Sequence, residues 1–288
     1  MARTTLTVSI VSGASADALS ACLRSLAAAG GAVEMAVRVV DNCAPFEVAG
    51  AIPAVLRSRT TILRNPERRG FGANHNKVLR GLDTAFALVL NDDVELAGGA
   101  LDEMLRVALA HPKAGMVGAT LYACDWAGPP IRGGGLPDAV APPPVKVCLY
   151  HLMRLACPCW TENTHRIDTS PPGAETRELS YVSGACALLR REMLRDVGLY
   201  DEGFRMYFED IDLGRRARDK GWRCLQAKAA RVKHLEGSSF SAATWPWLLA
   251  GARRYAHKHH GPATRLATDA LAAALGAVVR AKRGGAAC

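Results

Sequence analysis

The sequence predicts an α/β domain with a doubly wound, mostly parallel sheet flanked by helices, followed by a helical C-terminal tail. Three apolar runs rich in β-branched residues, at 6–11, 37–40 and 86–90, have the length and composition of buried strands. Residues 16–29 lie between the first two runs and place apolar side chains at helical spacing. Such alternation of strands and helices is typical of a parallel sheet that is covered on both faces.

The rest of the chain continues this alternation and then changes character. Further helices are predicted at residues 73–83, 99–110, 192–197 and 210–220, and further strands at residues 181–189 and 232–235. Residues 123–177 are rich in proline and glycine and predict an irregular insertion, in which residues 145–155 have helical character. We therefore expect one domain over residues 1–240 and a basic, helical tail over residues 241–288.

The composition limits the class of protein and of partner. The chain has 288 residues, of which 49% are hydrophobic, so it is long enough to bury a full core. Its formal net charge of +9 predicts an anionic partner: a phosphorylated substrate, an acidic membrane surface or nucleic acid. Nucleic acid is not expected, because no aromatic stacking motif or nucleic-acid-binding module is recognisable. No secretory signal pattern is evident and the apolar run at 270–279 is too short to span a bilayer, so we expect a cytoplasmic protein.

Polar residues follow two of the predicted strands at the point where each strand ends. Asp41 and Asn42 follow the second strand, and Asn91, Asp92 and Asp93 follow the third. Ligands of open α/β sheets bind at the carboxyl ends of strands. One carboxylate there can accept hydrogen bonds from a nucleoside, and another can hold a divalent cation against a diphosphate. Either group alone is equally well explained as a helix cap or turn, whereas both together favour a binding site.

A further acidic cluster opens the predicted helix near residue 210. Glu209, Asp210 and Asp212 lie in its first turn, directly after an aromatic and apolar run at 204–208. Acids stabilise any helix N-terminus, and Asp212 forms an i,i+4 pair with Arg216, so a purely structural explanation exists. That explanation does not account for the apolar run, which would draw the helix start against an apolar wall. A carboxylate in such surroundings has a raised pKa and can act as a general base.

His234 lies in an alternating, strand-like stretch and by itself is an ordinary residue. It also closes an ordered set of motifs. The set comprises residues 39–42, Asn65 with residues 70–72, and residues 90–93, 183–185, 198–202 and 206–216. Together these motifs resemble the family 2 glycosyltransferases of the GT-A fold, and most closely the bacterial rhamnosyltransferase-like group. The resemblance covers about residues 6–240, and it depends on the order of many motifs that are each weak alone.

The resemblance implies an inverting, metal-dependent transfer of a sugar from a nucleoside diphosphate to an acceptor hydroxyl. Rhamnose from dTDP-rhamnose is the first choice of donor, and the acceptor is expected to be a lipid-linked or cell-surface glycan precursor. Asp210 matches the catalytic base, with Glu209 as the reserve candidate. Asp93 and His234 match the ligands of a Mg²⁺ or Mn²⁺ ion.

Eight further residues match positions that bind the donor. They are Asp41, Asn42, Asn65, Gly70, Asn76, Asn91, Asp92 and Arg216. Of these, Arg216 is expected to face the diphosphate or an acceptor phosphate, and residues 183–185 are expected to line the acceptor side.

Departures from the family pattern concern the donor site and leave two alternatives. Residues 43–46 replace the serine and second aspartate that usually follow the Asp-Asn pair, and Asn91 stands where many members have an acid. These changes suggest a non-catalytic nucleotide-binding protein as one alternative, but the expected metal ligands and base are all present. A sugar-phosphate nucleotidyltransferase is the other, but residues 11–15 contain one glycine and no lysine for a triphosphate loop.

The tail predicts either a membrane contact or an ordinary packed helix. Residues 245–283 carry many lysines and arginines and two tryptophans, with Asp269 as the one acid. This pattern on an Ala/Leu-rich helix suits an anionic membrane surface, where a lipid-linked acceptor would be presented. It suits a packed helix with a solvated basic face equally well. A peripheral position on the inner face of the plasma membrane is therefore a hypothesis.

Overall fold

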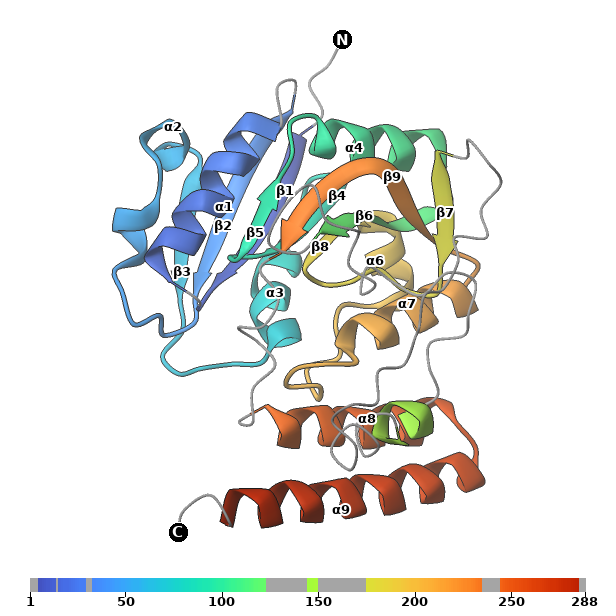
Figure 1. Ribbon diagram of the computed structural model, residues 1–288. Helices are drawn as coiled ribbons and strands as arrows, with labels where there is room; N and C mark the ends of the chain where they lie inside the picture. The colour runs from blue at the N-terminus through green and yellow to red at the C-terminus, as the bar shows by residue number, and fades with distance from the viewer. Residues whose placement is uncertain are drawn as a thin grey trace.

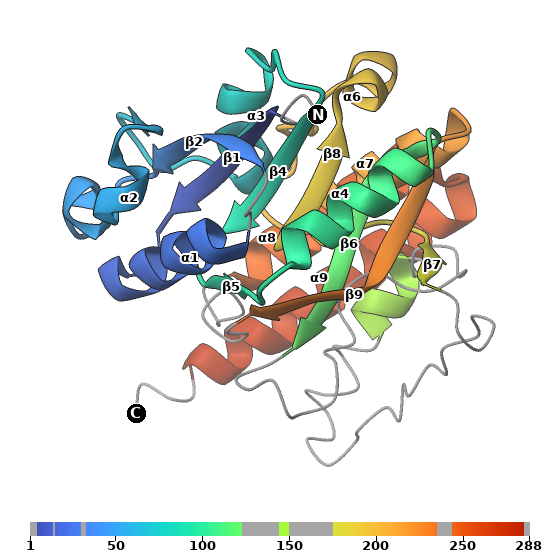
Figure 2. The same ribbon diagram turned by 90° about the horizontal axis from the view of Figure 1, so that it is seen from above.

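The computed structural model describes residues 5–13, 15–29, 33–122, 144–149, 175–234 and 244–284. A nine-stranded sheet lies at the centre, with helices on both of its faces (Figures 1 and 2). The strands are β1 (Thr5–Ser12), β2 (Glu34–Asp41), β3 (Thr60–Arg64), β4 (Phe86–Asn91), β5 (Val94–Leu96), β6 (Ala114–Tyr122), β7 (Thr176–Leu179), β8 (Cys186–Arg190) and β9 (Arg223–His234). Their order is β3-β2-β1-β4-β8-β6-β9-β5, and β7 pairs with β9 off this path.

The direction of the strands changes across the sheet. β1 pairs in parallel with β2 and β4, and β2 with β3. β8 is antiparallel to both β4 and β6, while β5 and β7 are antiparallel to β9. The predicted α/β class is confirmed, but parallel pairing is confined to the first half of the sheet and to β6 with β9. Because β4, β6 and β9 run in the same direction, β4 and β9 end at the same edge of the sheet.

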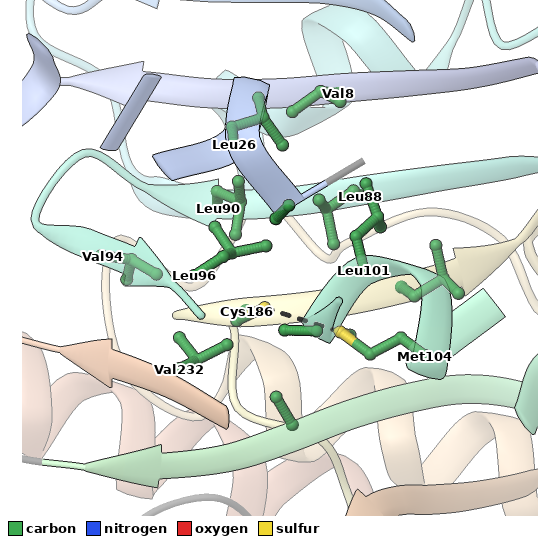
Figure 3. Packing of buried hydrophobic residues seen from close by; sticks show 14 of the residues in the cluster. Val8, Leu26, Leu88, Leu90, Val94, Leu96, Leu101, Met104, Cys186 and Val232 are labelled. Carbon is green, nitrogen blue, oxygen red and sulfur yellow. Dashed lines mark hydrogen bonds between the residues drawn. The ribbon is translucent and has the colours of Figure 1, made fainter. Parts of the chain in front are cut away.

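The described helices are α1 (Ala16–Ala29), α2 (Ala54–Arg57), α3 (Phe71–Leu79), α4 (Ala100–Ala110), α6 (Arg191–Val197), α7 (Glu209–Asp219), α8 (Trp245–His259) and α9 (Pro262–Gly284), with the 3₁₀ helix η1 (Val48–Ala51) and a helical turn at 144–149. Side chains of alternate β4 residues pack on opposite faces of the sheet. Leu88 and Leu90 belong to the cluster that contains α1 and α4, which Figure 3 shows from close by. Ala87 and Val89 belong to the cluster that contains α6 and α7. This two-sided burial explains why the run at 86–90 is continuously apolar.

The two C-terminal helices are attached through α7. Phe204, Phe208 and Ile211 pack with Leu248 and Tyr255 of α8 in a third apolar cluster. Figure 1 shows α8 beneath α7, with α9 on the far side of α8. Within the described part of the chain, no helix combines the length and apolar character needed to cross a bilayer.

Most predicted elements are present, with shifted ends. The helix predicted at 73–83 is α3, which begins at Phe71 and ends at Leu79. The short strand predicted at 232–235 is the end of the much longer β9. The helix predicted at 145–155 is seen at 144–149; its remainder, and most of the insertion at 123–177, lie outside the described residues.

The strand predicted at 181–189 begins only at Cys186, because a turn precedes it. The Cys186 N–H donates to the Ser183 carbonyl at 3.3 Å and closes this turn. Gly184, in the turn, lies so close to Phe71 that an added Cβ would be 2.6 Å from the ring. The turn places the Gly184 N–H next to the start of α7.

Candidate functional site

The end of β4 and the end of β9 are held together by the short strand β5. Val94, the first residue of β5, is paired with His234, the last residue of β9. As a result Asp93 Oδ1 lies 3.3 Å from His234 Nε2, and the Asn91 amide nitrogen lies 3.3 Å from the same ring nitrogen. We call Asn91, Asp93 and His234 the strand-end cluster. The structure thus brings together the two residues that the sequence analysis expected to share a cation.

Asp92 lies beside this cluster and points to a different neighbour. Its Oδ2 accepts a hydrogen bond of 2.7 Å from the Gly13 N–H, in the loop after β1. The side chain is buried. Asp92 therefore holds the β1 loop against the end of β4.

The strand-end cluster has the chemistry of a partial cation site. Asp93 offers carboxylate oxygen and His234 offers an imidazole nitrogen, and both are at least partly buried. The described residues contain no group of three or more His, Cys, Asp or Glu side chains that could hold a metal ion. Mg²⁺ is commonly bound by only one or two carboxylates together with substrate phosphates and water. The two side chains therefore fit a divalent cation that keeps open positions for diphosphate oxygens.

A network of amides connects the end of β2 with α3. Asn42 Oδ1 accepts hydrogen bonds from the Arg69 N–H (2.8 Å) and from Asn65 Nδ2 (3.1 Å), and Asn65 Nδ2 also donates to Asn74 Oδ1 (2.6 Å). Asp41 Oδ1 accepts the Ala44 N–H at 3.0 Å. The structure thus gathers Asp41, Asn42 and Asn65, which the sequence analysis assigned to the donor, at one end of β2.

Gly70 joins this region to the segment before α7. A Cβ at Gly70 would lie 2.5 Å from the Arg205 carbonyl oxygen, and the neighbouring Phe71 N–H donates to that oxygen at 2.9 Å. Close approach of two backbones is what requires glycine at this position.

Asn76 and Arg216, also expected at the donor, hold the loop between α6 and α7 instead. The buried Asn76 amide donates to the Tyr200 carbonyl (2.8 Å) and accepts from the Tyr200 N–H (3.1 Å). The Arg216 guanidinium donates to the carbonyls of Val197 (2.6 Å) and Leu199 (2.8 Å) and to Asp212 Oδ2 (2.8 Å). With these bonds made, the guanidinium faces the protein backbone, so the expectation that it faces a phosphate does not match this geometry.

The two acids at the start of α7 have different surroundings. Asp210 is half-buried; its Oδ1 accepts the Ile211 N–H at 2.8 Å and its Oδ2 accepts the Gly184 N–H at 3.2 Å. Glu209 is only 6% exposed, and its Oε2 has no hydrogen-bond partner among the described residues. Burial raises the pKa of both carboxyls, and the adjacent Asp210 charge raises the pKa of Glu209 further. Of the two carboxyls with a raised pKa, Asp210 therefore belongs to the less buried residue.

His75, the residue before Asn76, lies behind this region. It is fully buried, with Nδ1 2.8 Å from Ser9 Oγ and its ring 4.4 Å from the Phe71 ring. Burial lowers the pKa of His75 to about 3, so the imidazole is neutral at physiological pH. Its apolar surroundings make it part of the packing between β1 and α3.

Sequence reasoning missed a charged network between α7 and α8. Asp212 is fully buried and accepts hydrogen bonds from Arg216, Lys258 and His259. The network could not be read from the sequence, because Asp212 and its α8 partners lie far apart in the chain. Arg216, four residues after Asp212, was the one partner that the spacing indicated.

Comparison with known proteins gives three findings. The sequence model of glycosyltransferase-like family 2 matches residues 3–245. An N-acetylglucosaminyl-diphospho-decaprenol L-rhamnosyltransferase of Mycobacterium tuberculosis is 30% identical over 158 residues, which are 54% of this chain and 48% of that protein. The chain thus matches about half the length of this relative. An O-antigen biosynthesis protein RfbC of Myxococcus xanthus is 35% identical over 83 residues, 27% of this chain and 6% of that protein.

Solved structures with similar folds carry nucleotides and manganese. GalNAc-T7 with UDP, GalNAc and Mn²⁺ has a TM-score of 0.59 at 14% identity, covering 88% of this chain and 47% of that one. The mannosyltransferase PcManGT of Pyrobaculum calidifontis, in complex with GDP-Man and Mn²⁺, has a TM-score of 0.55 at 16% identity, covering 99% and 80%. At these identities the likeness establishes a shared fold.

Replacing Glu209 with glutamine is expected to stabilise the protein at neutral pH. Because burial raises the pKa of Glu209 in the folded state, the unfolded chain releases this proton at lower pH than the folded chain does. The free energy of unfolding of the wild type therefore falls as the pH rises above the ordinary glutamate pKa, and glutamine does not have this loss. Urea denaturation should show a Glu209→Gln advantage that is absent near about pH 4 and grows toward neutrality.

The matched control is Glu67→Gln, at an exposed glutamate. It should leave the pH dependence unchanged. Identical pH profiles for Glu209→Gln and the wild type would contradict the burial of an ionisable carboxyl at Glu209.

Proposed function

Because this chain belongs to the family 2 glycosyltransferases, we propose that it transfers rhamnose from dTDP-rhamnose to a lipid-diphosphate-linked sugar, with inversion at the anomeric carbon. Its fold is that of the GT-A glycosyltransferases, in agreement with the sequence analysis. The sugar and the acceptor are suggested by the mycobacterial relative, whose name specifies rhamnosyl transfer to a decaprenyl-diphosphate-linked N-acetylglucosamine. Family membership favours transfer over the nucleotidyltransferase and non-catalytic alternatives.

The observation that carries the proposal is the contact between Asp93 and His234. Two side chains distant in the sequence meet at the sheet edge where the ligands of α/β proteins bind. Asp93 and His234 would hold a Mg²⁺ or Mn²⁺ ion, with Asn91 beside them. Such an ion, when bound, stabilises the negative charge that develops on a departing diphosphate.

The base is proposed to be Asp210. The Asp210 carboxylate is fixed by the N–H groups of Gly184 and Ile211, and this residue is less buried than Glu209. As the acceptor oxygen attacks the anomeric carbon, Asp210 takes the hydroxyl proton while the bond from that carbon to the diphosphate oxygen breaks. Glu209 is too buried for this contact. A single displacement with one base inverts the anomeric configuration.

The nucleoside is proposed to lie at the end of β2. Asp41 can accept hydrogen bonds from a base or ribose, and the Asn42 and Asn65 amides fix the loop that borders it. Asp92 holds the loop after β1, and Gly70 lets the segment before α7 approach closely. Both are therefore proposed to shape the donor site indirectly, through these neighbouring segments.

The membrane contact is proposed for α9 alone. The cations of α8 are engaged within the protein: Arg253 with Asp269, and both Arg254 and Lys258 with Asp201. On α9, Leu266 is 73% exposed and Arg280 is exposed. An exposed leucine and an exposed arginine on the same helix suit an anionic surface that presents a lipid-linked acceptor. Arg280→Glu is expected to reduce binding to anionic vesicles, because it replaces a cation on α9 with an anion. Cosedimentation with the vesicles measures the effect. Binding equal to the wild type would leave α9 as a packed helix.

Asp93→Ala is expected to abolish Mn²⁺-dependent binding of dTDP, because it removes the carboxylate ligand of the pair. Calorimetric titration of dTDP with and without Mn²⁺ measures the effect. The control is Asp102→Ala, at an exposed acid on α4. Retention of wild-type, Mn²⁺-dependent affinity in Asp93→Ala would remove Asp93 from the cation site.

Asp210→Asn is expected to lower kcat by about 10²-fold or more, because an amide cannot take the acceptor proton. Donor affinity should change little, since the proton is transferred only in the transition state. Glu209→Gln should be milder. The measurements are kcat for rhamnosyl transfer and the Kd for dTDP in both variants. A larger loss in Glu209→Gln than in Asp210→Asn would move the base by one residue.

A further inference from the structure

The turn that leads into the two acids of α7 has a strained backbone. Tyr207 and Phe208 have φ values of 70° each, so two consecutive residues with large side chains adopt the left-handed conformation. Glu209 and Asp210 follow directly. Non-glycine residues hold this conformation only where the surrounding structure over-determines it. The position of Asp210 therefore depends on whatever restrains this turn.

Helix α8 supplies the restraint through packing. The Phe208 ring lies 5.6 Å from the Tyr255 ring, and the Tyr207 hydroxyl donates to Thr244 Oγ1 at 3.2 Å. Gly251 lets α8 approach the turn closely, because a Cβ there would lie 2.9 Å from the Tyr207 carbonyl oxygen. The strained turn is thus pressed against one face of α8.

The same helix is fixed by two acids on either side of the turn. Lys258 Nζ lies 2.7 Å from Asp212 Oδ1 and 2.8 Å from Asp201 Oδ2, so it joins them. His259 Nε2 lies 2.7 Å from Asp212 Oδ1, and Arg254 lies 2.7 Å from Asp201 Oδ1. Asp212 is fully buried, and truncating a partner of a buried ion pair leaves an uncompensated charge.

We propose that α8 is the positioning element of the catalytic base, with Lys258 and Gly251 as the residues that fix the strained turn and so the Asp210 carboxylate. The inference rests on the proposed role of Asp210. The match to the family model ends at residue 245, where α8 begins, so this contribution belongs to the part of the chain beyond it.

A loosened α8 has a predictable effect on Asp210. The turn would relax, water would reach the carboxylate, and the burial that raises the pKa of Asp210 would decrease. Among the described titratable groups, Glu209 beside it, Tyr181 before β8 and Tyr200 before α7 interact electrostatically with Asp210. Loss of the Lys258 cation, which pairs with Asp212, would by itself raise the pKa of a nearby carboxyl, so a lowered pKa of Asp210 in Lys258→Met reports a change of position.

The test compares Lys258→Met and Gly251→Ala with Arg253→Met. Arg253 is a cation on the same helix, but it pairs with Asp269 of α9. With dTDP-rhamnose and N-acetylglucosaminyl-diphospho-decaprenol as substrates, the first two variants should lose about tenfold to a hundredfold in kcat, because a misplacement of about 1 Å can cost that much. Their Kd for dTDP should stay at the wild-type value, Lys258→Arg should recover most of the activity, and Arg253→Met should resemble the wild type.

A second readout is independent of turnover. In ¹³C-aspartate-labelled protein, with the signal assigned through Asp210→Asn, the Asp210 carboxyl should titrate at lower pH in Lys258→Met and Gly251→Ala than in the wild type. An unshifted titration together with wild-type kcat would overturn the proposal, as would equal effects in Arg253→Met. If the wild type transfers no rhamnose, the proposed function fails, and the titration still decides the role of α8.

Discussion

The pairing of β5 with β9 is the contact on which the candidate site depends. β4 carries Asn91, Asp92 and Asp93 out of the sheet, and without β5 nothing in the local sequence would direct them toward His234. The three residues of β5 turn the chain back along β9 in register, with Val94 opposite His234. This register requires β4 and β9 to end at the same edge, which the antiparallel strand β8 between β4 and β6 makes possible. The mixed sheet therefore creates the site as well as the core.

The part of the site at the start of α7 is maintained although burial and backbone strain there reduce stability. Glu209 and Asp210 are adjacent carboxyls withdrawn from water, and the two residues before them have strained backbones. Burial of charged carboxylates and left-handed φ values both reduce stability. Such costs are common where a protein keeps a group poised for chemistry. The apolar cluster of α7 with α8, and the ion pairs of Asp201 and Asp212, compensate by holding the two helices together.

The fold could be predicted from the sequence where burial of a strand or helix produces a recognisable pattern of apolar residues. The runs at 6–11, 37–40 and 86–90 are apolar because both faces of their strands are covered. β6 was missed because alanine, glycine and methionine give it weak strand character, and only the end of β9 was predicted because basic residues interrupt the rest. The turn that shortens the strand predicted at 181–189 was missed, and the close contact of its Gly184 with Phe71 is a tertiary feature that the sequence does not show.

The site could be predicted where a sequence motif specifies which residue type stands at which position. Asp93 and His234 meet as expected, whereas Arg216 lies on the expected helix but bonds to the backbone at 197–199. A motif gives the identity of a side chain, and its direction depends on a loop elsewhere in the chain. For the same reason Lys258 and Arg254 suggested a membrane surface, although their partners are the distant acids Asp212 and Asp201.

The stereochemistry of the product tests the central claim most directly. Wild-type protein would be incubated with dTDP-rhamnose, Mn²⁺ and N-acetylglucosaminyl-diphospho-decaprenol, and the anomeric configuration of the new linkage determined by NMR. One base and a single displacement predict a rhamnoside whose anomeric configuration is opposite to that of the donor. A product with retained configuration would contradict this account, as would the absence of any rhamnosyl transfer.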